Sequence, residues 1–129
     1  MKPAFTANGS YNWEEYMENK DSLTKMYEII LDRKANPAEG SYTCYLFEKG
    51  LDKILKKVGE ECAETIIAAK NDGEGSREEL CGEVCDLLYH VLVMCAEKGL
   101  DISEILAEND RRAEKIGNLK QMKTVDRNT

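Results

Sequence analysis

The stretch that decides the fold is Gly59-Glu60-Glu61-Cys62-Ala63-Glu64, read together with Glu83-Val84-Cys85-Asp86. The two stretches place five carboxylates inside segments whose other residues are typical of core helices. Carboxylates are seldom fully buried unless they are paired or bound to a metal. We therefore expect these side chains to meet around a cation.

On a helical wheel, the acids of the first stretch lie on one side of the helix. With each residue advancing about 100°, Glu60, Glu61 and Glu64 fall within one arc, and the apolar residues of residues 51–70 occupy the opposite arc. Lys53 and Lys57 share the acidic stripe, one to two turns before the acids. Such a stripe is often only a solvated face with ion pairs one turn apart, and that interpretation stays open here.

The second segment, residues 82–96, is apolar on nearly every side, which is typical of a helix in a bundle centre or a subunit interface. Glu83 and Asp86 nevertheless lie near its start, within about 60° of each other. Three interpretations without a metal stay open. Glu83 could interact with the dipole at the N-terminus of the helix, the acids could pair with a buried lysine, or this end of the helix could simply be exposed. His90, on the same arc, is either a hydrogen-bonded core histidine or a base.

An antiparallel turn at Asn71-Asp72-Gly73-Glu74-Gly75 would set the two stretches opposite each other, because similar lengths of chain separate each from the loop. Oxygen donors converging between two helices suit Mg²⁺, or Mn²⁺, rather than zinc. The acids expected to converge are Glu61, Glu64, Glu83 and Asp86.

Magnesium held by carboxylates usually completes its coordination with water and substrate phosphates. Lys53, Lys56 and Lys57 lie beside the acids and are candidates to contact those phosphates, with Lys56 at the edge of the stripe. The chemistry that this arrangement favours is metal-assisted attack of water on a phosphoanhydride.

The rest of the chain predicts further helices and no strand. Asp21 and Ser41 are good N-caps, Gly50 and Gly99 are good stops, and Ser76 with Glu79 predicts a capping box. The expected fold class is an all-α bundle around a central antiparallel helix pair, completed by dimerisation. Helices are expected from near Asp21-Ser22 to before Asn36-Pro37, over Tyr42 to Lys49, from Leu51 to about Lys70 and from the Ser76 cap to about Lys98, with a last one from Asp101 or Ser103 through Arg112.

We expect three parts: a weakly ordered or peripheral arm at residues 1–20, a helical domain at residues 21–120, and a mobile tail at residues 121–129. The net charge of −7 argues against a surface that coats nucleic acid. No stretch looks like a signal peptide or a membrane span, so a cytoplasmic location is expected. The five cysteines are then expected to be reduced, four of them at positions that look buried.

A zinc site is a weaker alternative. Cys81 and Cys85 have the spacing of half such a site, but no second pair of cysteine or histidine residues completes it.

The motif ExxE, 18 intervening residues and ExxD resembles the metal motif of the all-α nucleoside-triphosphate pyrophosphohydrolases, the MazG-like superfamily. The flanking segments resemble, more specifically, the phosphoribosyl-ATP pyrophosphohydrolases of histidine biosynthesis, over residues 23–120. Those segments are Ser41-Tyr42-Thr43, Tyr45-Leu46-Phe47, Gly50-Leu51-Asp52-Lys53-Ile54, Lys57-Val58-Gly59-Glu60-Glu61, Asp86-Leu87-Leu88-Tyr89-His90, Arg111-Arg112 and Lys115-Ile116-Gly117-Asn118-Leu119-Lys120.

The resemblance implies hydrolysis of phosphoribosyl-ATP to phosphoribosyl-AMP and pyrophosphate, dependence on Mg²⁺, and a homodimer. It implies a catalytic role for Glu60, Glu61 and Glu64, with Glu60 either a further metal ligand or the residue that orients the attacking water. Arg111 and Arg112 would contact a phosphate or pair with surface acids. The next step of the pathway would come from a separate protein. The metal ligands implied are Glu61, Glu64, Glu83 and Asp86.

Two other functions remain open from the sequence. The first is a house-cleaning pyrophosphohydrolase that acts on free nucleotides. The second is a non-enzymatic helical interaction module, in which the acids only solvate a face.

Overall fold

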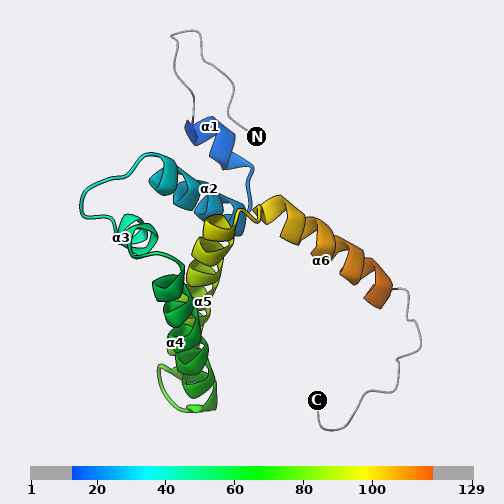
Figure 1. Ribbon diagram of the computed structural model, residues 1–129. Helices are drawn as coiled ribbons and strands as arrows, with labels where there is room; N and C mark the ends of the chain where they lie inside the picture. The colour runs from blue at the N-terminus through cyan, green and yellow to red at the C-terminus, as the bar shows by residue number, and fades with distance from the viewer. Residues whose placement is uncertain (1–12, 118–129) are drawn as a thin grey trace.

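The computed structural model describes residues 13–117, which form six α-helices and no strand, so the all-α prediction is confirmed. The helices α4 and α5 form a long antiparallel hairpin, and α6 projects away from it (Figure 1). α2 packs on α5, while α3 contacts α2, α4 and α5. The helices are α1 (Trp13–Glu18), α2 (Ser22–Ala35), α3 (Tyr42–Lys49), α4 (Leu51–Lys70), α5 (Ser76–Lys98) and α6 (Ile102–Gly117).

Most helix ends lie where the capping residues predict them. The Asp21 side chain accepts a hydrogen bond from the Thr24 amide at 2.9 Å, and Ser41 accepts one from the Cys44 amide at 3.2 Å. At the C-terminal end of α5, Gly99 adopts φ 72°, a left-handed conformation that glycine takes without the steric cost of a Cβ. These local signals fix where the chain turns, and so where the hairpin begins.

The capping box at Ser76 is a wrong prediction. Gly75 occupies the N-cap position of α5 with φ 82°, and no side chain caps this helix end. The Ser76 hydroxyl instead donates to the backbone oxygen of Gly73 at 2.7 Å, closing the tight turn that joins α4 to α5. The short helix α1 was also not expected, and residues 1–12 and the tail at residues 118–129 lie outside the described part of the chain.

The hydrophobic core lies where α2, α3, the start of α4 and the second half of α5 meet. Burial of the cysteines was over-predicted: Cys95 belongs to this core, whereas Cys62, Cys81 and Cys85 are exposed. The core residues are Tyr27, Ile30, Leu46, Ile54, Leu92, Val93, Cys95, Ala96 and Ile102.

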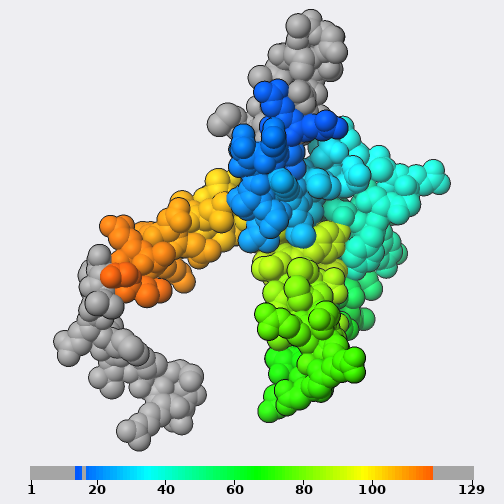
Figure 2. Space-filling view, turned by 180° about the vertical axis from the view of Figure 1, so that it is seen from behind, coloured from blue at the N-terminus to red at the C-terminus, as the bar shows by residue number. Residues whose placement is uncertain are grey.

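The loop end of the hairpin stands clear of this core, as the space-filling view also shows (Figure 2). Several large apolar side chains are therefore exposed there: Ile66 is 65% and Ile67 61% exposed, and Val84 and Leu88 are each 38% exposed. Among the described residues, no helix is long and apolar enough to cross a membrane. The uncovered apolar side chains lie on the helices that carry the acids.

Candidate metal centre

Three acids meet between the two helices of the hairpin. Glu61 projects from α4, Glu83 and Asp86 project from α5, and one carboxylate oxygen of each lies within 4.8 Å of the other two. Glu83 and Asp86 are three residues apart, so one helical turn presents both toward α4. The hairpin thus brings together three of the four acids that the sequence predicts as metal ligands.

Glu64, the fourth predicted ligand, is exposed and lies at the edge of this cluster. Desolvation raises the pKa of the Glu83 carboxyl, and a hydrogen bond that the protonated carboxyl donates to Glu64, with the negative charges of Glu64, Asp86 and Glu61, raises it further. Glu64 is therefore close enough to act on Glu83 although it is not one of the three acids that converge. The cluster is self-repulsive and favours any cation that enters it.

The cluster also contains buried oxygen atoms with unused hydrogen-bonding capacity. Glu61 is 5% exposed, and its Oε1 lies 3.5 Å from Lys57 Nζ and 4.0 Å from His90 Nδ1. Within the described residues, the Oε2 atoms of Glu61 and Glu83 are buried and have no hydrogen-bond partner. Buried acceptors are nearly always satisfied, so these orphan oxygens fit a hard divalent cation such as Mg²⁺ or Mn²⁺.

Thr65 joins the two helices beside the acids. Its hydroxyl donates to the backbone oxygen of Glu61 at 2.7 Å and also lies 3.3 Å from the backbone oxygen of Glu83, on the other helix. This contact fixes the separation of α4 and α5 at the level of the cluster. Sequence reasoning missed Thr65, although its place one turn after Glu61 on the same face could have suggested it.

The predicted lysines lie on α4, on the turns that precede Glu60 and Glu61. Lys57 Nζ donates to Glu60 Oε2 at 3.1 Å, and this hydrogen bond raises the pKa of Lys57 and lowers that of Glu60. Lys56 lies 4.0 Å from Glu60, and the charge of Lys53 also lowers the pKa of Glu60. Glu60 is exposed and stays outside the three-acid group, so its predicted role in orienting water rests on the resemblance alone.

His90 is buried and uses both ring nitrogens. Its Nδ1 lies 2.7 Å from the backbone oxygen of Asp86, which can only accept, so Nδ1 carries a hydrogen. In the neutral ring, Nε2 then accepts from the Tyr42 hydroxyl, 3.0 Å away. This bonding fits the core-histidine interpretation. Tyr42 was not predicted to reach the site, because its helix α3 is separated from α5 in the sequence.

The two predicted arginines lie elsewhere. Arg111 and Arg112 both bond to Glu108 on their own helix α6, and these bonds lower the pKa of Glu108 to about 2. In this chain α6 points away from the acid-bearing hairpin (Figure 1). The structure therefore places both arginines in surface ion pairs and does not bring them to the cluster.

Comparison with known proteins identifies the family. The sequence model of the phosphoribosyl-ATP pyrophosphohydrolases matches residues 23–113, which include every residue of the cluster. The chain belongs to this family. Its members are hydrolases by name, and the match runs from the second helix into the sixth helix of the described structure.

Curated relatives agree with the family. The chain is 53% identical over 105 residues to a phosphoribosyl-ATP pyrophosphatase of Clostridium acetobutylicum, covering 81% of this chain and 93% of that protein. It is 52% identical over 112 residues to a protein of the same name from Clostridium botulinum, covering 86% and 99%. The histidine biosynthesis bifunctional protein HisIE of Caldanaerobacter subterraneus is 53% identical over 102 residues, covering 79% of this chain and 48% of that protein.

Proposed function

We propose that this member of the family hydrolyses phosphoribosyl-ATP to phosphoribosyl-AMP and pyrophosphate, the second step of histidine biosynthesis, with a divalent cation at the acid cluster. Water is added across the phosphoanhydride bond between the α- and β-phosphates. The names of the family and of its curated relatives support the substrate. The carboxylates converging between α4 and α5 support the metal.

The observation that carries the metal assignment is the pair of buried, unpartnered oxygens on Glu61 and Glu83. With Asp86, these residues would hold Mg²⁺ or Mn²⁺, and Glu64 would complete the ligand set from the edge of the cluster. Bound there, the cation would neutralise charge that develops on the phosphates and would lower the pKa of a coordinated water. The buried position of Glu61 keeps one wall of the site dry and strengthens its electrostatics.

The lysines would bind the phosphate oxygens whose negative charge the cation does not neutralise. Lys57 is the best placed, because its ammonium group lies 3.5 Å from Glu61 and is partly exposed. Lys53 and Lys56 precede it on the same helix, Lys53 within the stripe and Lys56 at its edge. Glu60 would orient the attacking water once substrate draws Lys57 away from it. Contacts of Arg111 and Arg112 with a phosphate stay predictions.

We also propose that the chain is a homodimer formed through the hairpin. Two hairpins that pack together as a four-helix bundle would bury the apolar side chains that are exposed on α4 and α5. Sedimentation velocity should then give a dimer, and Ile66→Glu should shift it toward monomer. Ile29→Glu, at a site on α2 that is 53% exposed, is the matched control and should leave the dimer intact.

The test of function is pyrophosphate release from phosphoribosyl-ATP, measured beside ATP and dUTP, with Mg²⁺ and with EDTA. We expect release from phosphoribosyl-ATP that stops in EDTA and in the Glu83→Gln and Asp86→Asn variants. Release mainly from the free nucleotides would instead indicate a house-cleaning enzyme. A folded protein that releases nothing from any of the three would support the interaction-module interpretation.

A further inference from the structure

A cavity of about 890 Å³ lies between the end of α2 and α3. Small-molecule sites usually measure about 300–1,000 Å³, so this cavity is large enough for a nucleotide portion. The connecting loop bows outward there (Figure 1). Cys44 ties the loop down, because its Sγ accepts from the Ala38 amide and donates to the Arg33 carbonyl, both at 3.3 Å. The cavity is therefore held open by the fold.

Tyr42 lies between this cavity and the acid cluster. This residue lines the cavity, and its hydroxyl lies 3.0 Å from His90 Nε2. His90 Nδ1 is in turn 4.0 Å from Glu61 Oε1. Desolvation raises the pKa of the Tyr42 hydroxyl, and the smaller effects of the Lys57 and Glu61 charges lower and raise it respectively. A ligand with phosphates at the cluster would thus extend past Tyr42 into the cavity.

Two tyrosine rings form the wall at this point. Tyr42 and Tyr45 are stacked with centroids 6.0 Å apart and planes at 25°, yet they keep 46% and 39% of their surface exposed. Lys49 lies 5.7 Å from the centre of the Tyr45 ring and adds a positive charge beside it. Exposed aromatic rings at a cavity wall offer apolar surface against which a purine base can stack.

Arg33 is the cation most available to a ligand in this cavity. Its guanidinium bonds only to the neighbouring Asp32 among the described residues, at 3.2 Å, and its side chain is 40% exposed. Lys34, by contrast, donates to the Ala96 carbonyl at 3.1 Å and lies over the Phe47 ring. Lys34 is thus held by the core, whereas Arg33 can exchange an exposed ion pair for a phosphate at small cost.

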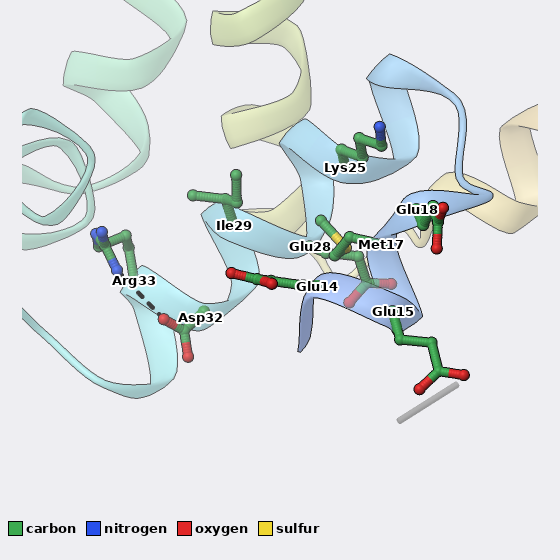
Figure 3. A pocket seen from close by; sticks show the side chains of 9 residues that line it. All are labelled: Glu14, Glu15, Met17, Glu18, Lys25, Glu28, Ile29, Asp32 and Arg33. Atoms are coloured by element: carbon green, nitrogen blue, oxygen red, sulfur yellow. Dashed lines mark hydrogen bonds and ion pairs between the residues drawn. The ribbon is translucent and has the colours of Figure 1, made fainter. Parts of the chain in front are cut away.

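The other large cavity does not suit a phosphorylated ligand. It measures about 1110 Å³, lies between α1 and α2, and is lined by five acids and two basic residues (Figure 3). Arg33 lines both cavities, and the other side chains here come from residues 14–32. The cavity beside α3 contains two acids as well, Glu39 and Glu48, but these are balanced by Arg33 and Lys34.

We propose that the cavity between α2 and α3 holds the phosphoribosyl-adenine end of the substrate, with the base against Tyr42 and Tyr45 and the 5-phosphate of the second ribose on Arg33. The inference rests on the proposed function and deepens it. Phosphoribosyl-ATP differs from ATP by this second ribose phosphate. Arg33 is then the residue that distinguishes the two nucleotides, although it lies outside the acid cluster.

The kinetic test uses Arg33→Gln, Tyr45→Ala and Tyr45→Phe. Loss of a charged hydrogen bond should raise the KM of Arg33→Gln for phosphoribosyl-ATP roughly 10- to 100-fold while kcat stays near that of the wild type. Loss of stacking should raise the KM of Tyr45→Ala roughly 5- to 150-fold, and Tyr45→Phe should restore it. Arg77→Gln, an exposed arginine in the first turn of α5, is the matched control.

Calorimetric titration of phosphoribosyl-AMP and AMP in EDTA separates this inference from the proposed function, because it needs neither metal nor turnover. Arg33→Gln should weaken binding of phosphoribosyl-AMP and leave that of AMP unchanged. Affinities and KM values within twofold of wild type in both Arg33→Gln and Tyr45→Ala would overturn the cavity assignment. A wild-type protein that fails to hydrolyse phosphoribosyl-ATP would instead overturn the function.

Discussion

Replacing Glu61 by glutamine should stabilise the metal-free protein. At an effective dielectric constant of 20, the attraction between Lys57 and Glu61 at 3.5 Å is worth about 4.7 kcal/mol. Glu83 and Asp86, each with an oxygen within 4.8 Å, oppose this attraction with two repulsions, so the sum is repulsive. The net repulsion on Glu61, about 1–2 kcal/mol once solvent screens the exposed side of the cluster, disappears in Glu61→Gln.

The expected shift follows from the size of the chain. For 129 residues, 1 kcal/mol corresponds to roughly 4 °C in Tm, so Glu61→Gln should melt about 4–8 °C higher in EDTA. In Mg²⁺, the wild type should instead melt at a higher temperature than Glu61→Gln. At 100 times its Kd, a cation stabilises the wild type by about 2.7 kcal/mol, or roughly 10 °C, and the variant, having lost a ligand, should gain much less.

Thermal unfolding followed by circular dichroism, in EDTA and over a Mg²⁺ series, measures both effects. Glu114→Gln removes the same charge from an exposed position on α6 and should shift Tm by less than about 2 °C in either condition. A Glu61→Gln protein that melts below the wild type in EDTA and keeps the full Mg²⁺ shift would show that the acids are not held as a repulsive cation site.

Three further outcomes are expected. Tyr27→Phe should cost about 1–2 kcal/mol at pH 7, because the buried Tyr27 hydroxyl donates to the Leu100 carbonyl at 2.8 Å. Burial raises the pKa of Tyr27 to about 12, so its contribution is complete below pH 10 and lost between about pH 10 and 12; urea unfolding should show the gap to Tyr27→Phe narrowing there. Thr65→Val should cost about 0.5–1.5 kcal/mol in urea and weaken Mg²⁺ binding in calorimetry, and unchanged values would exclude Thr65 as a link. The two arginines lower the pKa of Glu108 to about 2, so the stability that Glu108 adds to α6 is complete above about pH 4.5 and lost on acidification toward pH 2. In an acid titration, the wild type should lose helix content over this pH range, and Glu108→Gln should not show this loss.

The sequence predicts the hairpin well because the signals for it are local. Turn residues in the Asn71-Asp72-Gly73-Glu74-Gly75 loop and a stop at Gly99 set the ends of two long helices. Equal distances along the chain then place residues near 61–64 opposite residues near 83–86. The capping box failed because Gly75, with φ 82°, occupies the N-cap position, so Ser76 is already the first residue of α5 and its hydroxyl donates to the Gly73 carbonyl.

The remaining parts of the site depend on tertiary contacts that no pattern in one segment contains. The wheel shows which side of α4 carries Glu64, but only the packing of α4 against α5 decides whether its oxygen joins the other three acids or stays at their edge. In the same way, Tyr42 reaches His90 only because α3 folds back against α5. The spacing of residues in the sequence therefore does not predict which residues such contacts bring to the site.

The position of the acids along the hairpin also explains why a cluster of like charges is tolerated. The core of the chain surrounds the other end of the hairpin, where Ile54 and Val93 are fully buried. The acids thus lie between a stable base and a loop end whose apolar side chains, such as Ile66, have no cover in one chain. A repulsive site can persist there because the core supplies the stability, while a cation and a second copy of the hairpin would each add what the single chain lacks. The proposed metal binding and dimerisation would then strengthen each other, because both would restrict the separation of α4 and α5.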